Sequence, residues 1–304
     1  MVAMTIQGAD LPRTVELVDP PRSREWERID RKPSIGPVSD RPRLHFVTAR
    51  DGRSLTGWLY CPPPAVEQTG MMIYLHGGPE GQARPSHSEI FPGLLDEGIA
   101  VFTPNVRGGS GGQGREFVHA DDKDKRFAAI DDVADCAHYL AERGLADPTR
   151  IACAGWSYGG YLTMAALAFH PDLFVAGVSI CGMSDLGGTF YRTTEPWIAA
   201  ASYAEYGHPP IADRDLLDQL SPLQRVDKLT APLLLVHGGT DTNVPVSESE
   251  QMVEALRARG RTVRYLLFAD DGHEIVKREN HAALARAVAD WLAMAFERSQ
   301  IRKV

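Results

Sequence analysis

The strongest constraint on the fold is a repeated alternation of short apolar runs and amphipathic stretches. Apolar runs of strand length stand at 71–76, 99–106, 150–155, 174–181, 231–238 and 262–269. Helical patterns occupy 88–98, 124–144, 158–170, 247–259 and 279–298. Buried strands that alternate with helices are typical of a mostly parallel sheet covered by helices on both faces. The sequence therefore predicts an α/β protein.

This regular pattern starts at residue 43, and the residues before it differ in composition. "RLHFVTA" and "SLTGWLYC" flank "RDG", which predicts two strands joined by a tight turn. Residues 1–42 are polar and rich in Pro, Arg and Asp, so we expect an N-terminal extension. It either lies on the main domain, with Trp26 as a candidate anchor, or is partly disordered. We expect one main domain over 43–304, interrupted by a lid-like excursion at about 183–228.

Composition and charge narrow the class of partner. The 304 residues carry a formal charge of −8, which argues against nucleic acid, because phosphate binding needs a basic face. No apolar run reaches the length of a membrane span, and the first residues lack the pattern of a secretion signal. We therefore expect neither a nucleic-acid nor a membrane partner, and the sequence leaves a homo-oligomer open.

The four cysteines indicate a reducing environment. They stand at 61, 136, 153 and 181 and form no C-x-x-C pair. We interpret them as small buried hydrophobic residues rather than a disulfide or a zinc site. A cytoplasmic location is the corresponding expectation.

The segment "GWSYGGY" places Ser157 in a G-x-S-x-G pattern. A predicted strand precedes this serine and a predicted helix follows it, which is the setting of a nucleophile elbow. A serine hydroxyl is a poor nucleophile unless a neighbouring base takes its proton. The motif therefore indicates chemistry only if a base and an acid occur in suitable loops.

Two later loops supply these groups. Asp241 follows the apolar run "LLLVHG", and His273 follows the run "YLLFA". In an open parallel sheet, catalytic groups gather beyond the carboxyl ends of the strands. The chain order Ser157, Asp241, His273 is that of an α/β-hydrolase triad, which is the fold we expect.

Other residues compete for the base and the acid. His237 and His76 each end a strand before a Gly-Gly pair, where they more readily shape loops. Asp270 and Asp271 lie so close to His273 that we expect them to shape its loop, with Asp270 the rival orienting carboxylate.

An acyl-transfer site also needs donors for the oxyanion of its tetrahedral intermediate. Each donor typically contributes about 2.7–4 kcal/mol. The amide of Tyr158, directly after the serine, is one candidate, and the amide of Gly78 in the "HGGP" turn is the second.

Taken together, "HGGP", "NVRGGSGGQGREF", "GWSYGGY" and the Asp and His loops resemble the catalytic domain of the prolyl oligopeptidase family, peptidase family S9. The acylaminoacyl-peptidase-like branch is the most similar, and the resemblance covers about residues 43–298. It implies Ser157 as nucleophile, His273 as general base and Asp241 as orienting acid. It also implies an oxyanion hole formed by Gly78 and Tyr158.

The resemblance has departures. Family members usually carry an N-terminal β-propeller that screens substrates, and only about 42 residues precede the hydrolase-like domain here. We therefore expect this chain to lack the propeller. Glu274 and Ile275 stand where many relatives have Gly-Phe, and Asn243 stands where Arg is common.

Aromatic side chains in the excursion are candidates for a substrate pocket. Phe190, Tyr191, Trp197 and Tyr203 line an apolar pocket in one interpretation and merely pack the excursion onto the domain in the other. Arg107 either binds a carboxylate or, more readily, forms a structural ion pair with Asp131 or Asp132.

The sequence thus predicts a serine hydrolase that forms an acyl-enzyme on Ser157 without a metal or organic cofactor. The expected substrate is a peptide or an acyl-aminoacyl amide. A carboxylesterase, a small-molecule amidase and an acyltransferase, including one that cyclises peptides, are the alternatives on the same triad. A non-catalytic binding protein on a hydrolase scaffold is the alternative from another class.

Overall fold

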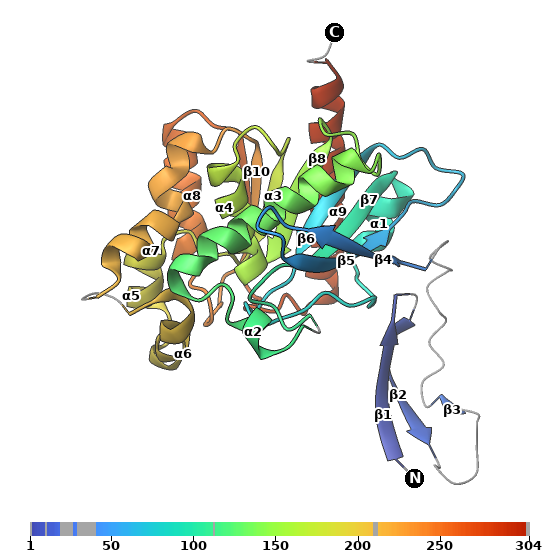
Figure 1. The fold of residues 1–304 in the computed structure, drawn as a ribbon, viewed down its shortest axis with the longest axis horizontal. Coiled ribbons are helices and arrows are strands. Elements are labelled where there is room, and N and C mark those ends of the chain that lie inside the picture. The colour runs from blue at the N-terminus through green and yellow to red at the C-terminus, as the bar shows by residue number, and fades with distance from the viewer. Residues whose placement is uncertain are drawn as a thin grey trace.

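A central eight-stranded sheet organises the protein (Figure 1). The computed structural model describes residues 2–9, 11–18, 27–28, 41–111, 113–208 and 212–301. The strands of this sheet are β4 (Arg43–Thr48), β5 (Ser54–Tyr60), β6 (Gly70–Leu75), β7 (Ile99–Asn105), β8 (Ile151–Trp156), β9 (Gly177–Ile180), β10 (Leu233–Gly238) and β11 (Val263–Phe268).

The spatial order of the strands is β11-β10-β9-β8-β6-β7-β5-β4. The pairs from β7 across to β11 are parallel, whereas β4 and β5 add two antiparallel pairings at one edge. The prediction of a mostly parallel sheet, with a hairpin before it, is confirmed. Because the carboxyl ends of parallel strands lie at one edge, the loops after β6, β8, β10 and β11 are brought together there.

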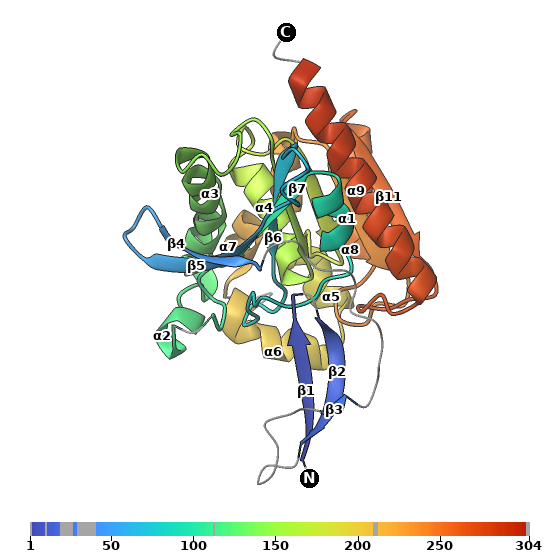
Figure 2. The same cartoon turned by 90° about the vertical axis from the view of Figure 1, so that its right-hand side faces the viewer.

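Helices cover both faces of the sheet (Figure 2). One face packs against α3 (Arg126–Glu142), α4 (Tyr158–Phe169) and α8 (Ser247–Ala258), and the other against α1 (Phe91–Asp96) and α9 (Arg278–Ile301). Alternation along the strands produces these two cores. In β6, for example, Met71 and Ile73 belong to the first core, and Met72 belongs to the second.

The segment over 183–228 is helical. A π-helical turn, Leu186–Phe190, leads into α5 (Tyr191–Thr193), α6 (Pro196–Tyr206) and α7 (Arg214–Leu220), and a 3-10 turn, Pro222–Lys228, leads back to β10. The predicted excursion thus inserts between β9 and β10.

Elsewhere in the chain, a short helix α2 (Arg115–Val118) and a 3-10 turn, Lys123–Lys125, precede α3.

The N-terminal residues contain strands that the sequence did not lead us to expect. β1 (Val2–Gly8), β2 (Leu11–Val18) and β3 (Glu27–Arg28) form a three-stranded antiparallel sheet. Met4 and Val15 of this sheet are 41% and 47% exposed, so it contributes little core of its own. Gln7 Nε2 donates to the carbonyl oxygen of His87 on the main domain at 3.4 Å. Trp26 lies outside the described residues.

The sequence led us to expect buried cysteines and no membrane-spanning segment. Cys136, Cys153 and Cys181 are buried thiols outside any disulfide, and Cys61 is partly buried. Within the described part of the chain, no helix has both the length and the apolar character needed to cross a membrane.

Candidate active site

Ser157 lies on a sharp turn between β8 and α4. Its φ of 57° and ψ of −118° are unfavourable for a residue with a side chain, as expected for a nucleophile elbow. A Cβ atom at Gly159 would lie 2.1 Å from the carbonyl oxygen of Leu75, so only glycine allows α4 to approach β6 this closely. The Ser157 amide donates to the carbonyl oxygen of Ile180 at 2.8 Å, which anchors the turn to β9.

The three residues of the predicted triad come together at the carboxyl edge of the sheet. His273 Nε2 lies 3.0 Å from Ser157 Oγ, and His273 Nδ1 lies 2.8 Å from Asp241 Oδ2. Ser157 follows β8, Asp241 follows β10 and His273 follows β11. The imidazole is therefore positioned to take a proton from the alcohol while the carboxylate holds its other nitrogen.

Asp241 is held on both carboxylate oxygens. Its Oδ1 accepts hydrogen bonds from the amides of Asn243 and Val244, both at 2.9 Å. Its side chain is fully buried, and burial alone would raise its pKa. Hydrogen bonds from His237 and His273 outweigh that effect, so the pKa of Asp241 lies well below its usual range.

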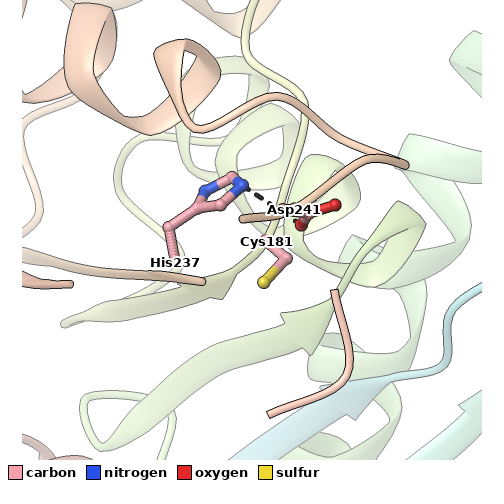
Figure 3. A group of neighbouring side chains, drawn as sticks. All are labelled: Cys181, His237 and Asp241. Atoms are coloured by element: carbon pink, nitrogen blue, oxygen red, sulfur yellow. Dashed lines mark ion pairs between the residues drawn. The ribbon is translucent and has the colours of Figure 1, made fainter. Parts of the chain in front are cut away.

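His237 lies directly behind the triad, with its ring directed at Asp241 (Figure 3). Its Nδ1 lies 2.7 Å from Ser249 Oγ, and its Nε2 lies 2.9 Å from the carbonyl oxygen of Val244 and 3.3 Å from Asp241 Oδ2. Because carbonyl and carboxylate oxygens only accept, Nε2 carries a proton, and Nδ1 forms the hydrogen bond with the serine hydroxyl. His237 thus shapes the Asp241 loop, which is the role that its sequence position indicated.

Three side chains at and behind the triad are of types that can bind a metal ion. Possible ligand atoms of Cys181, His237 and Asp241 lie within 4.8 Å of one another. Both ring nitrogens of His237 already form hydrogen bonds, and Asp241 Oδ2 faces His273. Burial and the nearby Asp241 raise the pKa of the Cys181 thiol, which favours its neutral form over a metal-binding thiolate. The donor set therefore fits support of Asp241 better than a metal.

The rival aspartates have other partners. Asp271 accepts from Asn280 Nδ2 at 2.7 Å and from the Val276 amide at 3.2 Å, and Asp270 pairs with Lys277. They fix the loop that carries His273, as predicted. Trp156 Nε1 adds a hydrogen bond to the carbonyl oxygen of His273 at 3.1 Å.

The predicted oxyanion residues, Gly78 and Tyr158, come from the turn after β6 and from the start of α4. Gly78 has a φ of 135°, and a Cβ atom there would lie 2.4 Å from the Gly81 amide nitrogen, so the turn requires glycine. Gly78 lines the same cavity as Ser157, and Tyr158 is the first residue of α4. The N-terminus of a helix offers amide donors to an anion.

A cavity of about 530 Å³ opens over Ser157 and His273. Its lining residues are Gly78, Pro79, Glu80, Ser157, Met183, Phe190, Trp197, Ile198, Ala201, Ser202, Glu205, Tyr206, Asn243, Val244 and His273. The excursion supplies about half of them, so this segment forms one side of the cavity.

Of the four predicted aromatic residues, the structure brings two to this cavity. Phe190 and Trp197 line it, with Phe190 buried and Trp197 66% exposed. Tyr191 and Tyr203 instead pack on each other, with ring centroids 5.7 Å apart, and Tyr191 donates to the carbonyl oxygen of Gly207. For those two rings the structure favours the packing interpretation.

A buried arginine that the sequence pattern did not indicate lies behind the cavity. Arg126 is fully buried and donates to Asp121 Oδ2 at 2.7 Å, to the Tyr158 hydroxyl at 2.6 Å and to Glu205 Oε2 at 3.0 Å. Burial, together with Asp121, raises the pKa of Glu205 to about 7 despite Arg126. No sequence signal marked this group, because Arg126 and Glu205 are 79 positions apart on two different helices.

Arg107 forms the structural ion pair that we preferred from the sequence. Its Nη2 lies 2.7 Å from Asp132 Oδ1, and its Nη1 lies 2.7 Å from Asp51 Oδ2. Of the two partners proposed for it, Asp132 is correct.

Comparisons with known proteins identify the family of this chain. The Prolyl oligopeptidase family model matches residues 86–299. Dipeptidyl aminopeptidase BIII of Pseudoxanthomonas mexicana is 32% identical over 81% of this chain and 37% of its own length. Acylamino-acid-releasing enzyme 2 of Oryza sativa subsp. japonica is 32% identical over 67% of this chain and 27% of its own.

Solved structures give the same result for the fold. A puromycin-hydrolyzing peptidase of Mycobacterium tuberculosis superimposes with a TM-score of 0.85 at 26% identity, over 97% of this chain and 46% of that one. An acylaminoacyl peptidase of Pyrococcus horikoshii gives 0.83 at 23% identity, over 94% and 47%. The chain thus spans less than half the length of these relatives. It has the α/β-hydrolase fold and belongs to the prolyl oligopeptidase family.

Proposed function

We propose that this protein is a serine peptidase that cleaves peptide or acyl-aminoacyl amide bonds. The observation that carries the proposal is the hydrogen-bonded series Ser157 Oγ, His273 and Asp241, with separations of 3.0 and 2.8 Å. The names of the relatives, an aminopeptidase and an acylamino-acid-releasing enzyme, support amide bonds as the target.

The proposed reaction starts when Ser157 Oγ attacks the substrate carbonyl carbon and His273 Nε2 takes the hydroxyl proton. Asp241 stabilises the imidazolium through Nδ1. The amides of Gly78 and Tyr158 donate to the oxyanion of the tetrahedral intermediate. The carbon–nitrogen bond then breaks, and His273 gives the proton to the leaving amine.

The second half-reaction releases the acyl group. Water attacks the ester carbonyl of acylated Ser157, and His273 takes a proton from that water. The ester bond breaks, the acid leaves, and the proton returns to Ser157 Oγ. An amine in place of water would give acyl transfer, which is why transfer and cyclisation belong to the same triad.

Labelling with a fluorophosphonate probe tests the enzyme class. We expect the wild-type chain to be labelled and Ser157→Ala to remain unlabelled. An unlabelled wild type would contradict the proposal and favour a binding protein.

A substrate panel separates the peptidase from its alternatives. It compares aminoacyl and acyl-aminoacyl p-nitroanilides with p-nitrophenyl esters of matched acyl groups. We expect turnover of anilides, abolished in Ser157→Ala. Turnover of esters without any anilide turnover would replace the peptidase by a carboxylesterase.

The proposal assigns catalysis to residues 43–304 and treats residues 1–42 as an N-terminal extension. The buried thiols of Cys136, Cys153 and Cys181, which lie outside any disulfide, support a reducing compartment, so a cytoplasmic location is part of the proposal.

A further inference from the structure

The cavity over Ser157 contains one buried acidic side chain on a mostly apolar side. Glu205 is 9% exposed and stands among Met183, Ile198, Tyr206 and Val244 in the cavity lining. A carboxylate in such surroundings loses hydration, which is costly unless a cation or hydrogen-bond donors replace the water. Its surroundings therefore determine what kind of ligand the cavity favours.

The charges around Glu205 leave an acidic excess. Carboxylate oxygens of Glu205, Asp121 and Asp122 lie within 4.8 Å of one another. Arg126 faces both Asp121 and Glu205, at 2.7 and 3.0 Å. Asp122 lies 3.3 Å from His119 Nδ1. One permanent cation is thus shared between two buried carboxylates.

Arg126 does not depend on the Glu205 carboxylate alone. Its guanidinium also donates to Asp121, to the Tyr158 hydroxyl and to the carbonyl oxygen of Glu205, and it lies 4.4 Å from the centre of the Tyr206 ring. Glu205 lines the cavity, whereas Asp121 is fully buried behind it. Glu205 is therefore the member of this group that a substrate can reach.

We propose that the cavity selects substrates that present a cation, an alkylammonium or a guanidinium, to the carboxylate of Glu205. The cation is either the side chain of a Lys or Arg residue next to the scissile bond or a free N-terminal amine. This inference rests on the proposed function, since it concerns the same cavity. The aromatic face of Tyr206 and the apolar side chains around Glu205 accommodate the methylene groups of such a side chain.

The test compares pairs of p-nitroanilides of similar structure in which only one member carries the positive charge. One arm pairs lysine with norleucine and arginine with citrulline at the residue that forms the acyl-enzyme. The other arm pairs dipeptide anilides with free and acetylated N-termini. We expect kcat/KM of wild type to be about tenfold or more higher for the cation in one arm, because a neutral analogue covers the Glu205 carboxylate without adding to the single cation, Arg126, that this carboxylate shares with Asp121. The arm that shows the preference identifies the source of the cation.

Two variants assign that preference to Glu205. Glu205→Gln removes the charge, and we expect the ratio to approach one. Glu80→Gln makes the same change at an exposed lining residue, and we expect the ratio to stay at its wild-type value. Glu205→Asp keeps a carboxylate and should retain part of the preference. Circular dichroism establishes that each variant is folded.

Specific outcomes overturn the inference while leaving the proposed function intact. Equal kcat/KM for charged and neutral partners in both arms of wild type, with good anilide turnover, would exclude a cation site and needs no variant. Loss of the preference in Glu80→Gln, but not in Glu205→Gln, would place the site elsewhere. Failure of every anilide together with absent fluorophosphonate labelling would instead contradict the proposed function itself.

Discussion

The loops at the carboxyl edge of the sheet and the helical excursion over 183–228 meet at one cavity, but they are built differently. Each triad residue follows its own strand of the central sheet, and backbone amides or carbonyls hold its loop. The excursion instead presents side chains from helices whose own positions depend on packing. The comparison teaches that the sheet fixes the reacting groups, whereas packed helices fix which substrates reach them.

The electrostatics of the two regions differ in the same way. Asp241 lies against two imidazoles and two amides, and its pKa is lowered. Glu205 lies on α6 of the excursion, and Glu248 lies on α8, where it accepts hydrogen bonds from the first residues of the excursion. Burial raises the pKa of each to about 7. An acid that stays ionised suits the triad, whereas burial favours the neutral form of Glu205 and Glu248, and only added cations or hydrogen-bond donors would favour their charged forms.

The largest expected effect is at the sheet edge. Asp241→Asn should lower kcat by about 10³–10⁴-fold, because the amide can donate to His273 and stabilise the wrong tautomer. The measurement is kcat for a neutral anilide, with the melting temperature as evidence of folding. Asp270→Asn, at the exposed rival carboxylate, is the matched control and should stay within a few-fold of wild type. Equal losses in both variants would contradict the assignment of Asp241.

In the excursion, we expect stability to change more than chemistry. Phe190 is 2% exposed and packs against Tyr191 and Tyr206, so Phe190→Ala should cost about 3–5 kcal/mol of unfolding free energy. It should also raise KM for large apolar substrates. Trp197→Ala, at a 66% exposed ring of the same cavity, should change stability by about 0.5 kcal/mol or less.

Urea denaturation of both variants measures these changes in unfolding free energy. Similar destabilisation by the two substitutions would show that Trp197 is buried by something beyond the described packing. A large fall in kcat of Phe190→Ala at saturating substrate would remove the distinction between the two regions.

The same contrast explains how far the sequence alone could lead. The triad was predictable because apolar runs mark buried strands, parallel strands align their carboxyl ends, and a glycine-framed serine marks the elbow. The side chains of the excursion were not. Tyr191 and Tyr203 are as aromatic as Phe190 and Trp197, but helix orientation decides which rings face the cavity.

Charged groups behind the cavity were equally hidden. Arg126 stands in a helix whose pattern reads as amphipathic, and a guanidinium on such a helix normally faces solvent. Only the tertiary arrangement shows that it is fully buried between Asp121 and Glu205. The strands of the N-terminal hairpin were missed for a related reason, because its apolar residues build little core.

The pH dependence of stability tests whether Glu248 anchors the excursion to α8. Its Oε2 accepts from the amides of Ser184 and Asp185 at 2.6 and 2.8 Å, and burial raises its pKa to about 7. Since the folded-state pKa is above the unfolded one, its contribution to stability is full below the unfolded pKa. That contribution is lost as pH rises through about 7.

Between pH 5 and 8, wild type should therefore lose about 2 kcal/mol of stability through this group. Glu248→Gln keeps the acceptor oxygen without the titration, so its unfolding free energy should fall less over that range. Glu250→Gln, exposed on the same helix, is the control and should follow wild type. Parallel pH profiles for wild type and Glu248→Gln would refute the role of Glu248.

The smallest expected effect on activity concerns His237, which lies behind the triad. His237 is fully buried, its Nε2 lies 3.3 Å from Asp241 Oδ2, and its ring bridges the Val244 carbonyl oxygen and Ser249. We infer that it positions Asp241, so His237→Gln should lower kcat by about tenfold through a small misplacement of the carboxylate. KM should change little, because His237 is outside the cavity lining. A rise in KM with unchanged kcat would mean that β10 transmits the change to the substrate side, and the separation between the two regions would then fail at this strand.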